Sequence, residues 1–217
     1  MFVQQRWITD GAMATMLFAR GASVHRPVEE LNLKLAALVR DVHRDYLNAG
    51  AQILLTNTFG ANRIRLAHFD LETKVTAINN AGVRIAREVA RDKAFVAGCI
   101  GPTGVRLAPL CSLTEEEAVH VFYQQAATLT GVDLYVLETF QDLAELRAAV
   151  KGVREAAGDD VVVIAHVSVE DDGRLADGTT PERYGPALNA LAVDAIGINV
   201  PFGGFKQSGF GRDLSMH

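Results

Sequence analysis

The chain has 217 residues, of which 49% are hydrophobic and 22% charged, enough apolar surface for one large core and too much for a disordered chain. Its net charge of −5, with scattered Lys and Arg, excludes the basic footprint of a nucleic-acid or membrane-surface protein. No apolar run reaches the ~20 residues of a spanning helix, and the first residues lack a signal peptide's apolar stretch. We therefore expect a cytoplasmic single domain with a small-molecule partner.

Short apolar segments rich in β-branched residues recur along the chain and predict strands. Most are continuously apolar rather than alternating, which is typical of strands covered on both faces. The predicted strands are 6–9 (RWIT), 51–56 (AQILLT), 94–98 (AFVAG), 133–138 (DLYVLE), 161–167 (VVVIAHV) and 195–199 (AIGIN).

Longer stretches with helical periodicity separate these strands. Residues 38–47 carry apolar side chains on one helical face, and Gly50 supplies a stop. The stretch after Glu72 repeats this pattern, and Thr114 followed by Glu117 is a capping-box signature. Two further helices are predicted, over 140–158 and 180–193, the second with Pro181 in its first turn.

About six βα units of near-regular length predict the fold class: an α/β protein of the (β/α)8 TIM-barrel type, with the barrel incomplete. A doubly wound sheet is the alternative, but no G-x-G-x-x-G turn follows the first strand. Polar residues at the carboxyl end of strand after strand also favour a barrel, whose active sites form at that end.

The polar residues at the strand ends are the candidate site. Asp10 and Glu138 could together bind an ammonium group, ligate a metal, or act as acid and base. Alternatively, Asp10 caps the following helix and Glu138 pairs with a structural Arg. No strand ends in a lysine, which argues against Schiff-base chemistry. The strand-end residues are Asp10, Thr56, Asn57, Thr58, Cys99, Glu138, Thr139, His166, Ser168 and Asn199.

The same residues lie in motifs that resemble the homocysteine S-methyltransferase family, which includes the homocysteine-binding domain of methionine synthase and betaine-homocysteine methyltransferase. The motifs cover residues 7–199 in the family's order, and we assign residues 1–199 to a truncated barrel of this kind. They are TDGAMATML, ELNL, VHRDYLNAGAQILLTNTFGANRIRL, GCIGPTG, DLYVLETFQDLAE, DGTTPE and DAIGIN.

This resemblance implies a (β/α)8 barrel that binds homocysteine and transfers a methyl group to its sulfur, giving methionine. Asp10 and Glu138 match residues that hold the ammonium end of the amino acid in the family, and Asn57 and Thr58 match a segment that lines the mouth of the family's barrel. In the family, a zinc ion held by three cysteines keeps the homocysteine sulfur a thiolate, since a thiol of pKa about 8.5 is mostly protonated at neutral pH. The resemblance leaves the methyl donor open between methylcobalamin, methyltetrahydrofolate and S-methylmethionine.

The chain departs from the family pattern at the zinc ligands. Val200 occupies the first ligand position and offers no lone pair, and the family's adjacent cysteine pair has no counterpart. Cys99 and His166 are conceivable substitutes, or simply a small buried residue and a core histidine. We therefore expect impaired methyl transfer; the alternative is a non-catalytic remnant that folds or self-associates through exposed barrel edges.

The last segment, 200–217, is predicted to be a glycine-rich tail unrelated to the barrel. About 17 residues of it, PFGGFKQSGFGRDLSMH, resemble a segment near the C-terminus of aldehyde dehydrogenases. No counterpart of the catalytic cysteine or cofactor domain of those enzymes is present, so no dehydrogenase activity is expected. The combination suggests a truncated or chimeric chain.

Overall fold

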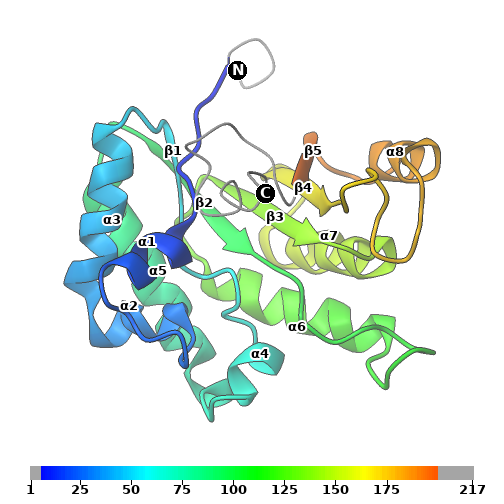
Figure 1. The fold of residues 1–217 in the computed structure, drawn as a ribbon, viewed down its shortest axis with the longest axis horizontal. Coiled ribbons are helices and arrows are strands. Elements are labelled where there is room, and N and C mark those ends of the chain that lie inside the picture. Colours follow the sequence, from blue (N-terminus) through cyan, green and yellow to red (C-terminus); the bar gives the residue numbers. More distant parts are fainter. Residues whose placement is uncertain (1–5, 200–217) are drawn as a thin grey trace.

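The computed structural model describes residues 6–199, so the predicted tail and the Val200 position lie outside the described residues. Helices and strands alternate along this part of the chain (Figure 1). The strands are β1 (Ile53–Leu55), β2 (Phe95–Ile100), β3 (Leu134–Phe140), β4 (Val162–Ser168) and β5 (Ala195–Asn199). The α-helices are α1 (Met13–Ala19), α2 (Leu31–Lys34), α3 (Ala36–Asn48), α4 (Arg63–Ala67), α5 (Val75–Ala90), α6 (Glu115–Thr128), α7 (Leu143–Ala157) and α8 (Pro181–Asn189); short 3-10 helices cover Val28–Glu30 and Glu72–Lys74.

The five strands form one parallel sheet in the order β1-β2-β3-β4-β5. Each strand pairs with the next one along the chain, and the order never reverses, as it would in a doubly wound sheet. This arrangement is a sector of a (β/α)8 barrel, which confirms the predicted fold class and its incompleteness within the described residues.

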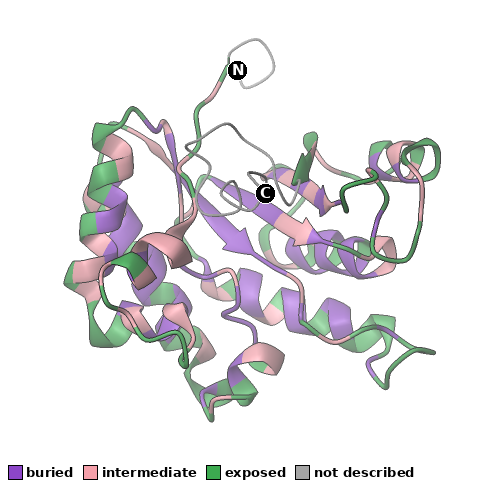
Figure 2. Cartoon of the chain, viewed as in Figure 1, coloured by how far each residue is buried: buried purple, intermediate pink, exposed green. Residues whose placement is uncertain are grey.

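The sheet has two chemically different faces. The outer face packs against α6, α7 and α8, and a large apolar cluster that includes Phe122, Leu137, Phe140 and Val167 fills the space between them (Figures 1 and 2). The inner face carries a smaller apolar layer that includes Ile53, Ala97, Leu134 and Val136. No helix in the described part of the chain is long and apolar enough to cross a membrane.

The first predicted strand is the main error in the predicted elements. Residues 6–9 do not form a regular strand; Thr9 makes an isolated parallel bridge to Ile53. The segment still runs beside β1, because the Ile8 carbonyl accepts the Gln52 amide and the Asp10 amide donates to the Ile53 carbonyl. This segment therefore places Asp10 at the carboxyl end of the sheet, as predicted.

The helix signals were more reliable. The capping box is present, with the Thr114 hydroxyl accepting the Glu117 amide and the Glu117 carboxylate accepting the Thr114 amide. Pro181 lies in the first turn of α8, as predicted. The short helices α1, α2 and α4 were not predicted, since they are only seven, four and five residues long and carry little periodicity.

Candidate functional site

Asp10 and Glu138 meet at the carboxyl end of the sheet. Asp10 follows the bridge to β1, and its Oδ2 accepts the Leu55 amide at 2.9 Å. Glu138 lies on β3, where its Oε1 accepts the Cys99 thiol of the neighbouring β2 at 3.3 Å. The sheet therefore brings together three of the polar strand-end residues that the sequence analysis singled out.

The electrostatics of this cluster are unusual because its acidic groups have no Lys or Arg partner among the described residues. Burial raises the pKa of the Asp10 carboxyl well above its ordinary range, and the neighbouring Glu138 raises it further. Burial also raises the pKa of Glu138 and of the Cys99 thiol. Among residues 6–199, neither carboxyl group forms an ion pair with Lys or Arg. The cluster is thus suited to a cationic ligand.

Asp10 does not act as a helix cap. The N-cap residue of α1 is Ala12, with no side-chain capping bond, and Asp10 Oδ1 is buried without a hydrogen-bond partner. Behind it lies His43 of α3, fully buried, with Nδ1 3.9 Å from Asp10 Oδ2. Burial lowers the pKa of His43 to about 4, so the imidazole is neutral and does not compensate the carboxyl group.

Asn57 and Thr58 belong to the loop that follows β1, and both are buried. The Asn57 amide nitrogen donates to the Val28 carbonyl and to Asn32 Oδ1, while the Thr58 hydroxyl donates to the Cys99 carbonyl at 2.8 Å. Their polar groups are thus bonded within the protein, next to the Asp10–Glu138–Cys99 cluster. They fix the loop at the rim of the site.

Two buried carboxylates that the sequence analysis missed hold the neighbouring loops. Glu29 accepts the Gly60 amide at 2.6 Å, and Glu145 accepts both the amide and the hydroxyl of Thr103. Burial raises the pKa of each, and the positive charge of Arg65 opposes that shift in both. Neither glutamate had a distinguishing signal, because each has other charged residues near it in the sequence, as exposed glutamates commonly do.

On β4 and β5, His166 and Ser168 share a face with Gly197 and Asn199. His166 pairs in register with Gly197, and a Cβ at Gly197 would lie 2.5 Å from the His166 ring. Glycine therefore makes room for the imidazole, whose pKa is lowered by burial. His166 is a partly buried residue of the inner face and does not join the Asp10–Glu138 pair.

Comparison with known proteins shows the family of the chain. Residues 7–201 match the family model described as homocysteine S-methyltransferase. The chain belongs to this family. It is 35% identical to the methionine synthases of Mycobacterium tuberculosis and Mycobacterium leprae over 232 aligned residues, which cover 99% of the chain. The chain spans only 19% of the length of these relatives.

Solved structures of the same family support the barrel assignment. The oxidised form of the homocysteine methyltransferase MmuM from Escherichia coli superposes with a TM-score of 0.77 at 26% identity, over 90% of this chain and 74% of that one. Its metallated form gives a TM-score of 0.73 at 27% identity, over 91% and 75%. The homocysteine methyltransferase barrel is therefore the architecture to which the five-stranded sector belongs.

A metal site of the kind the family resemblance implies does not fit the residues of this chain. The whole sequence contains two cysteines, Cys99 and Cys111, fewer than a three-thiolate site needs. Cys99 is buried against Glu138, whereas Cys111 is exposed on the loop after β2. Within residues 6–199, no group of three or more His, Cys, Asp or Glu side chains could hold a metal ion.

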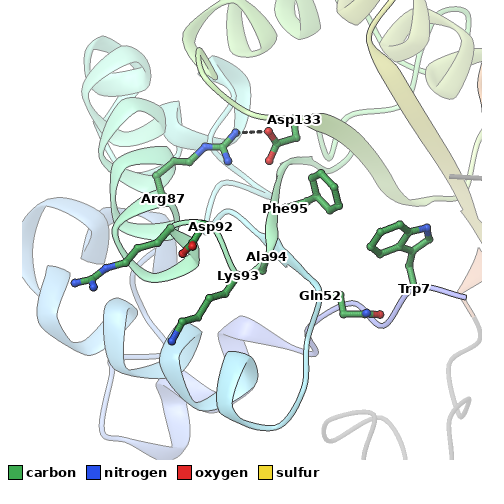
Figure 3. A pocket seen from close by; sticks show the side chains of 9 residues that line it. Trp7, Gln52, Arg87, Asp92, Lys93, Ala94, Phe95 and Asp133 are labelled. Atoms are coloured by element: carbon green, nitrogen blue, oxygen red, sulfur yellow. Dashed lines mark ion pairs between the residues drawn. The ribbon is translucent and has the colours of Figure 1, made fainter. Parts of the chain in front are cut away.

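A separate hollow of about 270 Å³ lies at the opposite, amino end of the strands (Figure 3). Trp7 and Phe95 line one side of it with their rings 5.3 Å apart, and the Arg87–Asp133 ion pair lines another. The amino end of a β/α barrel serves stability rather than catalysis. The candidate site is therefore the carboxyl-end cluster and not this hollow.

Proposed function

We propose that the chain binds homocysteine at the carboxyl end of its barrel sector, with Asp10 and Glu138 receiving the α-ammonium group. The observation that carries this proposal is a pair of carboxyl groups without a Lys or Arg partner among the described residues: Asp10, whose side chain is buried with an orphaned oxygen, and the half-buried Glu138. Burial raises the pKa of both. An ammonium group would supply the missing positive charge and a donor for Asp10 Oδ1, and its charge would favour ionisation of both acids.

Asn57 and Thr58 enter the proposal as residues of the rim. Direct contact with substrate would require them to exchange hydrogen bonds that they now make to Val28, Asn32 and Cys99. We therefore give them the task of holding the mouth in shape while the two carboxylates bind the ligand. Orienting the amino acid in this way would direct its sulfur toward a methyl donor.

The reaction that this site would serve is transfer of a methyl group to the homocysteine sulfur, giving methionine. We propose that this chain alone performs it poorly, because a neutral thiol is a weak nucleophile and the chain lacks the thiolate set for a metal. Methylcobalamin, methyltetrahydrofolate and S-methylmethionine are all candidate donors. The missing thiolates also favour a second candidate function, a non-catalytic domain that binds the amino acid only.

Isothermal titration calorimetry tests the binding step. We expect L-homocysteine to bind, and 4-mercaptobutyrate, which keeps the thiol and carboxylate but lacks the amine, to bind at least about tenfold more weakly. D10N and E138Q should lose a similar factor, whereas E155Q, which changes an exposed carboxylate on α7, should not. Equal affinity for the two ligands would refute the ammonium site.

An assay of methionine formation tests the chemical step. Each of the three methyl donors is supplied in turn, with and without added zinc, and the product is measured by mass spectrometry. We expect at most trace turnover by the chain alone. Robust turnover would refute the claim of impaired activity, and homocysteine binding without turnover would support the non-catalytic alternative.

A further inference from the structure

Strand β3 departs from regular alternation at the site. Leu137 and Phe140 both belong to the outer apolar cluster, yet two residues separate them instead of one. The pairing with β4 shifts accordingly, from Leu137 opposite Ala165 to Phe140 opposite Val167. One residue has thus been inserted into β3, which defines a β-bulge.

The bulge consists of Glu138 and Thr139, which together lie opposite the single residue His166 of β4, and both side chains reach the inner side of the sheet. Glu138 accepts the Cys99 thiol there. The Thr139 hydroxyl accepts a hydrogen bond from Asn199 Nδ2 at 3.0 Å. Asn199 lies on the inner face, because it pairs in register with Ser168, whose neighbour Val167 faces outward. The bulge therefore presents two consecutive side chains to the site, which a regular strand cannot do.

The backbone of Thr139 is strained. Its φ angle is +65°, in the left-handed region that β-branched residues rarely adopt. Strain of this kind persists only where surrounding contacts hold it, and it clusters at functional sites. The hydrogen bond from Asn199, which spans from β5 to β3 across the end of β4, is such a contact.

We propose that Thr139 is a positioning residue: its left-handed conformation forms the bulge that returns Phe140 to the outer face, while Glu138 stays on the inner face with Leu134 and Val136 and keeps its carboxylate beside Cys99. The hydrogen bond from Asn199 holds Thr139 in this conformation. The role assigned to Glu138 rests on the proposed function, whereas the bulge and its lock do not. Without the inserted residue, either Glu138 or Phe140 would have to leave its present face. Phe140 packs against Phe122 with ring centroids 5.8 Å apart, and this contact opposes a move of Phe140 to the inner face.

Substitutions at position 139 separate the backbone conformation from the hydroxyl. T139S keeps the bond to Asn199 and should resemble the wild type. T139G loses the hydroxyl and tolerates a positive φ, whereas T139A loses the hydroxyl and keeps the strain. In thermal unfolding, T139G should therefore melt above T139A, and equal melting temperatures would contradict the role of strain.

The pKa of the Cys99 thiol reports where the Glu138 carboxylate lies. Burial raises that pKa most, and the charge and hydrogen bond of Glu138 raise it further. If Thr139 positions Glu138, T139A and N199A should lower the pKa of Cys99 in the same direction as E138Q, with T139S and T139G near the wild type. Thiolate absorbance against pH measures it, in a C111S background that removes the other thiol.

The matched control is V163A, which weakens packing in the same outer cluster but lies on β4 opposite Tyr135, away from the bulge. It should lower the melting temperature and leave the pKa of Cys99 unchanged. A T139A protein whose Cys99 titrates as in the wild type would overturn the proposal. Should T139A fail to fold, N199A carries the same test, because Asn199 lies at the rim and is exposed.

Homocysteine affinity provides the third measurement. The loss of positioning should weaken binding about fivefold in T139A and N199A, the size expected for one hydrogen bond, and less in T139G. If the wild-type chain binds no homocysteine, the proposed function fails. The melting order and the Cys99 titration still decide the role of Thr139 in that case.

Discussion

Glu138 and Asp10 hold their protons more tightly in the folded chain than in the unfolded one, because burial raises both pKa values. Above about pH 4, where unfolded carboxyl groups ionise, the folded state therefore binds more protons than the unfolded state at the same pH. The contribution of these two groups to stability is fully present below that pH and is lost as the pH rises through their raised pKa values.

E138Q should remove this dependence for one of the two groups. Glutamine keeps an acceptor for the Cys99 thiol and carries no charge, so we expect E138Q to be more stable than the wild type at pH 8 and nearly equal to it at pH 4. Urea unfolding at several pH values measures the difference. E155Q is the exposed control, and a destabilised E138Q at pH 8 would contradict the burial argument.

His43 should act in the opposite direction. Its pKa is lowered to about 4 by burial, against about 6.5 in an unfolded chain. Stability should then be lost as the pH falls from 6.5 to 4, by about 3 kcal/mol in total. In urea unfolding, H43Q should not lose stability between pH 6.5 and pH 4 in this way. H120Q, which changes an exposed histidine of α6, should lose it as the wild type does. An unchanged acid profile in H43Q would mean that His43 titrates normally.

The residues of the site differ in how far the sequence predicts them. Asp10 and Glu138 stand at strand ends, and the topology brings strand ends together, so their meeting could be predicted. The burial of His43 follows from its spacing to Val39 and Val42 on one helical face. The bulge at Thr139 could not be predicted, because it depends on the pairing of β3 with its neighbour.

At the scale of elements, helix α7 lies so close to α6 that only glycine fits at the crossing. A Cβ at Gly152 would lie 2.6 Å from the Val119 carbonyl oxygen and 2.7 Å from the Tyr123 amide nitrogen. These are backbone atoms of α6, so the clash cannot be relieved by a change of side-chain rotamer. The two helices must separate to accept any larger residue, and the outer apolar cluster lies between them and the sheet.

G152A should therefore destabilise the chain by about 2 to 4 kcal/mol, in the range of overpacked cores. G185A is the matched control, because Gly185 lies in α8 with open space around it. There, alanine should stabilise the helix by up to about 1 kcal/mol. Urea unfolding of the two variants gives the comparison, and a neutral G152A would show that α6 and α7 pack less tightly than the structure indicates.

Elements were predictable where the pattern was local and long. Strands β1 to β5 and helices α3, α5, α6, α7 and α8 follow from apolar runs, periodicity and caps. Residues 6–9 have the composition of a strand but bond partly through the Gln52 side chain, whose oxygen accepts the Ile8 amide. A composition signal cannot distinguish that arrangement from a regular ladder.

At the scale of the whole molecule, the described residues form an open sector, and a sector has edges that a closed barrel lacks. Strand β5 has a strand partner, β4, on one side only among residues 6–199. Its Ile196 and Ile198 are 47% and 55% exposed. Both alternate with Gly197, which packs on His166, so the isoleucines lie on the outer face, where helices cover the other strands.

We expect this 217-residue chain to self-associate through that edge, because exposed apolar side chains beside unpaired strand amides favour pairing with another copy. Sedimentation velocity should show a weight-average mass that rises with concentration. I196E/I198K should shift the distribution toward monomer, since each charge would have to be desolvated on association. The control is V24E, which alters an exposed apolar residue far along the chain from β5 and should leave the distribution unchanged. A wild-type chain that stays monomeric at high concentration would refute the expectation.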